Sequence, residues 1–169
     1  MTFVVRDARP EDIPRLQAIE RAAAELFRGT GLIDIDRMSV LPADEHRAAI
    51  EDHLSLVAEA DGAVVGFVMG EAYPPACYLH ELDVAPSHGR RGAGALLVDA
   101  FCRRAAARGA TRVVLSTFIG PAWNAPLYRR LGFADLPASE LLPWMEAIAA
   151  AHAVFLDPST RTFMARRIS

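Results

Sequence analysis

The spacing of apolar residues along the chain changes from a helical period to a β-strand period. After a short apolar start at residues 3–7, apolar side chains recur three to four positions apart as far as residue 27, which predicts an amphipathic helix. Pro10, Glu11 and Asp12 precede this run, and proline and acidic residues favour the first turn of a helix. A second helix is expected to begin at Pro42 and to extend to about residue 54. The first third of the chain therefore reads as one short strand followed by two helices.

The remainder of the chain is predicted to be rich in strands. Residues 54–60 and 63–70 are β-type runs joined by Asp61-Gly62, a dipeptide typical of tight hairpins. Further strands are expected at residues 78–84, 113–118 and 160–168, and one begins at Phe133, with helices at 92–108, 122–131 and 139–151. Because a hairpin precedes alternating helices and strands, the pattern predicts an α/β fold with a mixed sheet and helices on its faces.

Length and composition narrow the class of protein. A chain of 169 residues with 52% hydrophobic residues fits a single domain over residues 1–169 with one core. The apolar runs are too short to cross a bilayer, and Arg6 and Asp7 follow the N-terminus too closely for a signal peptide, so we expect a cytoplasmic protein without a membrane partner. The net charge of −3 argues against a nucleic-acid partner. Cys77 and Cys102 and the five histidines show no metal-ligand spacing, so no metal is expected.

The most informative segment joins a strand to a long helix at residues 84–97. Paired glycines, Gly92 and Gly94, stand where the helix begins, and two arginines precede them. Such a junction offers free backbone N–H groups and the positive end of the helix dipole, while glycine allows close approach of a ligand. The segment is therefore predicted to hold an anionic diphosphate. Leu97 occupies the position of the third glycine of a dinucleotide fingerprint, and no Lys-Ser or Lys-Thr pair of a P-loop is present.

At these residues the sequence resembles the GNAT superfamily of N-acetyltransferases. The family loop reads Gln/Arg-x-x-Gly-x-Gly/Ala after a strand that ends in Val-x-Pro, and Val84, Pro86, Gly92 and Gly94 match it, whereas Gly89 departs from the first position. Downstream, the family segment Asn-x-x-Ala-x-x-Leu-Tyr-x-x-x-Gly-Phe aligns at four residues. These four are Leu127, Tyr128, Gly132 and Phe133. The resemblance covers roughly residues 54–133 and implies a mostly antiparallel, mixed central sheet of about seven strands flanked by helices.

The resemblance also implies how the chain would use its residues. The cosubstrate would be acetyl-CoA, held by main-chain groups of the strand and by the glycine loop. Those cofactor-binding positions are Leu82, Asp83, Val84, Gly89, Arg90, Arg91, Gly92, Ala93, Gly94, Ala95 and Tyr128. The family asparagine falls on Pro121, and Asn124 either takes over a coenzyme contact from a displaced position or only caps or hydrogen-bonds locally.

Catalysis by such a site requires a proton donor for the thiolate and an acceptor for the proton of the amine. Tyr128 matches the family tyrosine that protonates the leaving thiolate. Strict alternation would place Tyr78, His80 and Leu82 on one face of their strand and Leu79, Glu81 and Asp83 on the other. The base is then His80, or Glu81 if a β-bulge turns it inward, or water.

The sequence therefore predicts an acetyl-CoA-dependent N-acetyltransferase that moves an acetyl group to a primary amine by direct attack. The acceptor would be a small-molecule or peptide amine, and a homodimer is compatible with the sequence. Two alternatives stay open. One is a non-catalytic acyl-CoA-binding or regulatory domain of the same fold, and the other is a structural domain without a ligand. Trp123 and Trp144 either line an apolar pocket or serve ordinary packing.

Overall fold

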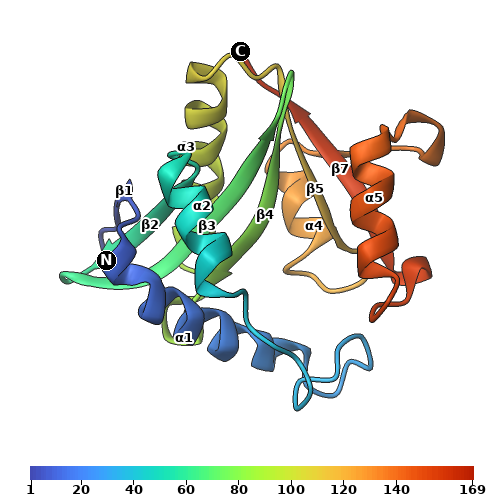
Figure 1. The fold of residues 1–169 in the computed structure, drawn as a ribbon. Helices are drawn as coiled ribbons and strands as arrows, with labels where there is room; N and C mark the ends of the chain where they lie inside the picture. The colour runs from blue at the N-terminus through green and yellow to red at the C-terminus, as the bar shows by residue number, and fades with distance from the viewer.

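A seven-stranded sheet forms the centre of the protein. The computed structural model describes all 169 residues, and the strands follow the order β1-β2-β3-β4-β5-β7-β6 (Figure 1). All neighbouring strands are antiparallel except β4 and β5. The mixed, mostly antiparallel sheet predicted from the sequence is confirmed. The strands are β1 (Val4–Asp7), β2 (Ser55–Ala60), β3 (Ala63–Tyr73), β4 (Ala76–Val84), β5 (Arg112–Phe118), β6 (Ala134–Asp135) and β7 (Arg161–Arg167).

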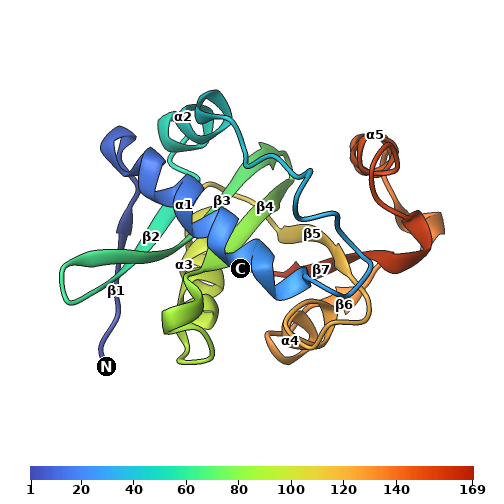
Figure 2. The same ribbon diagram turned by 90° about the horizontal axis from the view of Figure 1, so that it is seen from below.

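Helices cover both faces of the sheet. On one face lie α1 (Ile13–Ala24) and α2 (Ala43–Glu51), which bury Val57, Phe67 and Met69, and α5 (Pro143–His152), which covers the β4, β5 and β7 side of the same face. The opposite face carries α3 (Ala93–Ala107) and α4 (Ala125–Arg130). Figure 2 shows α2 and α5 above the sheet and α3 and α4 below it. No helix has the length and apolar character needed to span a membrane.

Several element boundaries differ from those predicted. The strand β3 runs to Tyr73 rather than to residue 70, and α4 begins at Ala125 rather than at residue 122. The helix α5 begins at Pro143, because residues 138–140 form a separate 3-10 turn. Proline suits the first turn of a helix, so Pro126 and Pro143 explain where α4 and α5 begin.

The strands β4 and β5 pair only over a short stretch. Their parallel register joins Ala76–Tyr78 to Arg112–Val114 and then stops, although β4 continues to Val84 and β5 to Phe118. In Figure 1 the two strands separate below this point. The second half of β4 therefore has a strand partner only on its β3 side.

A β-bulge in β4 changes which side chains share a face. The consecutive β3 residues Met69 and Gly70 pair with Glu81 and Leu79, so His80 is the extra residue. After the bulge Leu82 packs with Leu79 in the cluster under α3, while Glu81 pairs with Met69 on the α1 and α2 face. The strict alternation predicted from the sequence is wrong, because one inserted residue shifts the period of two.

Candidate active site

The glycine loop leads directly into the N-terminus of α3. Gly92 is the N-cap residue with φ 95°, and no side chain caps the helix. Within the helix the first intrahelical donor is the N–H of Leu96, which binds the carbonyl of Gly92 at 3.1 Å. The N–H groups of Ala93, Gly94 and Ala95 are thus left without an intrahelical acceptor, as expected for the first turn. This end of α3 carries the positive end of the helix dipole and suits an anion.

The loop has two residues with positive φ and open space above Gly94. Gly92 and Arg90 both adopt positive φ, at 95° and 60°, and a non-glycine residue in this region is uncommon. A Cβ added at Gly94 would meet only Val84 Cγ2, at 3.9 Å, so the space above this residue is open. Gly89 has φ −63° and ψ 153°, an ordinary extended conformation. The backbone conformation at Gly89 therefore does not explain why this residue is glycine rather than the glutamine or arginine of the family loop.

The free edge of β4 faces the gap between β4 and β5. The N–H of Ala85 donates to the carbonyl of Val65 at 2.7 Å, which extends the β3–β4 ladder by one hydrogen-bonded pair. In an antiparallel pair such residues alternate with others whose backbone groups point away from the partner. By this alternation the main-chain groups of Leu82 and Val84 point into the gap, while their side chains pack under α3.

Tyr128 on α4 lies at the same gap from the other face of the sheet. It is buried among the residues under α3 and packs edge-on against Phe133, with ring centroids 5.7 Å apart. Burial raises the pKa of Tyr128, and the charges of Glu81 and Asp83 raise it further.

Three carboxyl groups meet on the α1 side of β4. Burial raises the pKa of Glu81, and burial together with Glu81 and Glu20 raises that of Asp83. Asp83 Oδ2 is buried and accepts no hydrogen bond. Glu20 on α1 is also buried; both its oxygens accept from the N–H of Leu41, at 3.0 and 3.1 Å. Burial and the charge of Glu81 raise the pKa of Glu20 to about 8.

These carboxyl groups have no cationic partner. The ion pairs of the protein lie elsewhere, and none includes Glu20, Glu81 or Asp83. Such surroundings favour the protonated form of a carboxyl group. Sequence reasoning missed Glu20, because it stands on an ordinary amphipathic helix, and only the crossing of α1 over β4 brings it to the site.

The histidines of this face form a loose group. His80, in the bulge, lies 6.0 Å from the Tyr78 ring between centroids. His46 on α2 is fully buried against Phe67, with ring centroids 5.6 Å apart, and neither of its nitrogens has a hydrogen-bond partner. Burial lowers the pKa of His46, and burial lowers that of His152 on α5 to about 4. Both rings are therefore neutral at neutral pH.

Asn124 forms a local contact. Its Nδ2 donates to Thr117 Oγ1 on β5 at 3.0 Å, and its side chain does not cap α4 although it holds the N-cap position. Of the two local roles considered together from the sequence, the hydrogen bond is present and the helix cap is not. Asn124 Oδ1 is buried without a partner, and a coenzyme contact stays a prediction.

The two tryptophans differ in their surroundings. Trp144 on α5 stacks on Tyr73 with centroids 4.3 Å apart, and this is ordinary packing. Trp123 is more than a third exposed and lies 5.7 Å from the Phe27 ring, between centroids, at the end of β5.

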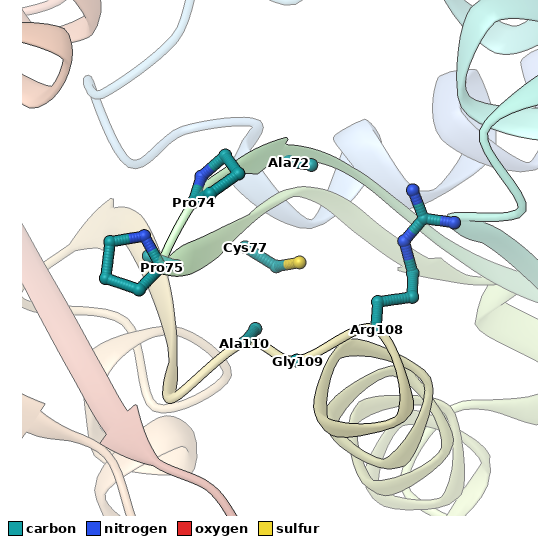
Figure 3. A pocket seen from close by; sticks show the side chains of 8 residues that line it. Ala72, Pro74, Pro75, Cys77, Arg108, Gly109 and Ala110 are labelled. Carbon is teal, nitrogen blue, oxygen red and sulfur yellow. The ribbon is translucent and has the colours of Figure 1, made fainter.

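A separate cavity lies at the other end of α3. It measures about 340 Å³ and is bounded by the β3–β4 turn and by Arg108, Gly109 and Ala110, with the Cys77 side chain beside it (Figure 3). The fifteen residues of α3 separate it from the glycine loop by about 22 Å at 1.5 Å per residue. It contains no cluster of acids or bases, and no group of three or more His, Cys, Asp or Glu residues in the protein is arranged to hold a metal ion.

Comparison with known proteins identifies the family and the fold of the chain. The sequence model of the acetyltransferase (GNAT) family matches residues 16–133. Among solved structures, the PaiA N-acetyltransferase from Thermoplasma acidophilum in complex with coenzyme A has a TM-score of 0.75 at 15% identity, over 99% of both chains. The ribosomal-protein-S18-alanine N-acetyltransferase from Escherichia coli has a TM-score of 0.71 at 16% identity, over 99% of this chain and 95% of the other.

A longer relative also contains this fold. The N-acetylglutamate synthase from Neisseria gonorrhoeae, complexed with coenzyme A and N-acetyl-glutamate, has a TM-score of 0.75 at 16% identity. It matches all of this chain, which spans only 36% of the synthase. At these identities the structural matches show a common fold, whereas the family model covers more than half of the sequence. The chain therefore belongs to the acetyltransferase (GNAT) family.

Proposed function

We propose that the protein is an N-acetyltransferase that moves the acetyl group of acetyl-CoA to an amine by direct attack. One observation supports this above the others: β4 and β5 separate where the free N-terminus of α3, the phenol of Tyr128 and the carboxyl groups of β4 can act on one extended ligand. Several solved proteins of this fold were crystallised with coenzyme A or acetyl-CoA.

The chain would hold the cosubstrate through its backbone. The N–H groups of Ala93, Gly94 and Ala95 would bind the diphosphate, with Arg90 and Arg91 adding positive charge at the rim. Main-chain groups of Leu82 and Val84 would bind the pantetheine arm along β4. A main-chain N–H of this strand would then donate to the thioester oxygen, where negative charge develops during attack.

Proton transfer would involve both faces of the sheet. The amine must lose a proton before or during attack, and Glu81, backed by Asp83, is suited to accept it because the pKa values of both carboxyl groups are raised. The amine nitrogen then bonds to the thioester carbon, the carbon–sulfur bond breaks, and Tyr128 gives its proton to the thiolate. His80 is the alternative acceptor, either directly or through water.

Thiol release in the presence of acetyl-CoA and a panel of amines, followed together with thermal stability, tests the proposal. Turnover supports it. A thermal shift with acetyl-CoA but no turnover with any amine would indicate a binding or regulatory domain, and the lack of both would refute a coenzyme site.

Two matched substitutions would then identify the base. If Glu81 is the acceptor, Glu81→Gln lowers the rate on the order of 10²-fold and His80→Gln lowers it much less. The reverse order would assign the role to His80, and equal small effects would assign it to water.

A further inference from the structure

Arg161, at the start of β7, is an arginine without a counter-ion. It lies on the face of the sheet that α1, α2 and α5 cover, here called the acceptor face because the proposed base Glu81 lies on it. It lies opposite Phe118 in the β5–β7 register and is half-buried. Its Nη2 donates to Ser116 Oγ at 3.1 Å, and its Cζ stands 4.5 Å from the centre of the Phe118 ring. It takes part in no ion pair, and its Nε is buried without a hydrogen-bond partner.

The guanidinium is held in place by packing rather than by a carboxylate. A stacked ring on one side and a hydroxyl acceptor fix its plane, which leaves most of its five N–H donors unused. A buried donor without an acceptor costs stability, so such a group calls for a partner that the folded chain does not supply. A planar guanidinium fits a carboxylate particularly well.

Arg161 also lies within the electrostatic reach of the proposed reaction centre. Burial lowers its pKa, whereas Tyr78, Glu81 and Tyr128 oppose this effect, so all three lie near it. The acceptor face thus has acids on β4 and α1 and one unpaired cation on β7. A substrate with an amine and a single negative charge would place its amine beside the acids and its negative charge beside Arg161.

Apolar side chains adjoin the arginine. Phe27 packs on Phe118 with ring centroids 5.3 Å apart, and Trp123 packs on Phe27. Leu26 and Ile119 beside them are 49% and 44% exposed. The neighbourhood of Arg161 therefore offers an apolar surface as well as a positive charge.

We propose that Arg161 binds the carboxylate of the acceptor, and that the acceptor is an amino acid with an apolar side chain. This rests on the proposed acetyl transfer and narrows it to one substrate class. The amino group would lie toward Glu81 and attack the thioester, while the carboxylate would accept hydrogen bonds from the Arg161 guanidinium. A peptide N-terminus lacks this neighbouring carboxylate and fits less well.

The test compares acceptors that differ only in the carboxylate. The probes are phenylalanine, phenylalaninamide and phenethylamine, with leucine and 3-methylbutylamine as a second pair. In the wild type kcat/KM should favour each free acid over its uncharged counterparts by about 10²-fold or more, because a site built to bind a group discriminates against analogues that lack it. Phenylalaninamide is the stricter comparison. Its amino group is less basic than that of phenylalanine, so a larger fraction of it is in the neutral form that can attack the thioester.

Arg161→Met retains an apolar stem against Phe118 and removes the charge. The ratio of kcat/KM between acid and amide should fall to about one in this variant, a loss of the same order of about 10²-fold. Arg167→Met, an exposed arginine on the same strand, is the matched control and should keep the ratio. The thermal shift with acetyl-CoA shows whether each variant is folded.

Three results would overturn the assignment. The wild type could use acid and amide equally well, or the ratio of kcat/KM between acid and amide could be unchanged in Arg161→Met. The third is a fall of this ratio to about one in the control Arg167→Met. If no acceptor is turned over at all, the proposed acetyl transfer is refuted, but the role of Arg161 in binding a carboxylate is still to be tested. Calorimetry with N-acetylphenylalanine in the presence of coenzyme A then decides the role of Arg161, since binding to the wild type but not to Arg161→Met supports it and equal binding contradicts it.

Discussion

Replacing Gly94 by leucine should stabilise the protein and abolish coenzyme binding. Gly94 does not have a positive φ, and an added Cβ would meet only Val84 Cγ2 at 3.9 Å, so the fold accepts a side chain here. Glycine within a helix costs about 0.5–1 kcal/mol relative to alanine. For a domain of this size, that gain corresponds to a rise in Tm of about 1–4 °C without ligand. Gly92 is less suitable for the experiment, because its φ of 95° strains any side chain.

Binding should change in the opposite direction. A ligand present at one hundred times its Kd stabilises a protein by about 2.7 kcal/mol, which is a Tm shift of about 5–11 °C at this chain length. Wild type should show this shift with acetyl-CoA, and Gly94→Leu should lose it, because the side chain fills the space above the free N–H groups. Ala107→Leu, at the exposed end of the same helix, should retain the shift. A full shift in Gly94→Leu would mean that the diphosphate does not lie at the N-terminus of α3.

Three further substitutions follow from the buried polar groups. Tyr128→Phe should lower turnover on the order of 10²-fold while the acetyl-CoA thermal shift persists, and unchanged turnover would remove the phenol from catalysis. Because the pKa of Glu20 is raised to about 8 from 4.5, its contribution to stability is full below pH 4.5 and is lost as the pH rises to 8. Glu20→Gln should therefore remove a loss of about 3 kcal/mol between pH 5 and pH 8 in urea unfolding, and identical pH profiles would contradict this. His46→Leu should stabilise the protein by about 1 kcal/mol at pH 7, since it removes a buried ring without hydrogen-bond partners. This advantage should grow as the pH falls below 6.5, where the unfolded histidine gains a proton that the native ring resists, and a destabilised variant would refute the reasoning.

Local patterns sufficed to predict most of the fold, including the glycine loop that leads into α3. The Asp61-Gly62 hairpin, the long helix after Gly92 and the seven strands depend on residues close together in the sequence, and each is present. The position of this loop could be predicted because its glycines and the start of the helix are consecutive in the sequence. Its binding of a diphosphate stays a prediction.

The acceptor face could not be predicted in the same way. The bulge at His80 depends on the pairing of β4 with β3. The alternation of side chains along a single strand does not reveal where one extra residue is inserted. Glu20 and Arg161 come from α1 and β7, which lie far from β4 in the sequence and meet it only in the folded sheet. An arginine without a counter-ion also cannot be recognised until its neighbours are known.

A crystal structure of the protein with acetyl-CoA tests the central claim most directly. We expect diphosphate oxygens within hydrogen-bonding distance of the N–H groups of Ala93, Gly94 and Ala95. The pantetheine arm should lie along β4 between β4 and β5, with the thioester sulfur facing the hydroxyl of Tyr128. Coenzyme bound elsewhere, such as in the cavity beside Cys77, or a thioester remote from Tyr128 would contradict the account.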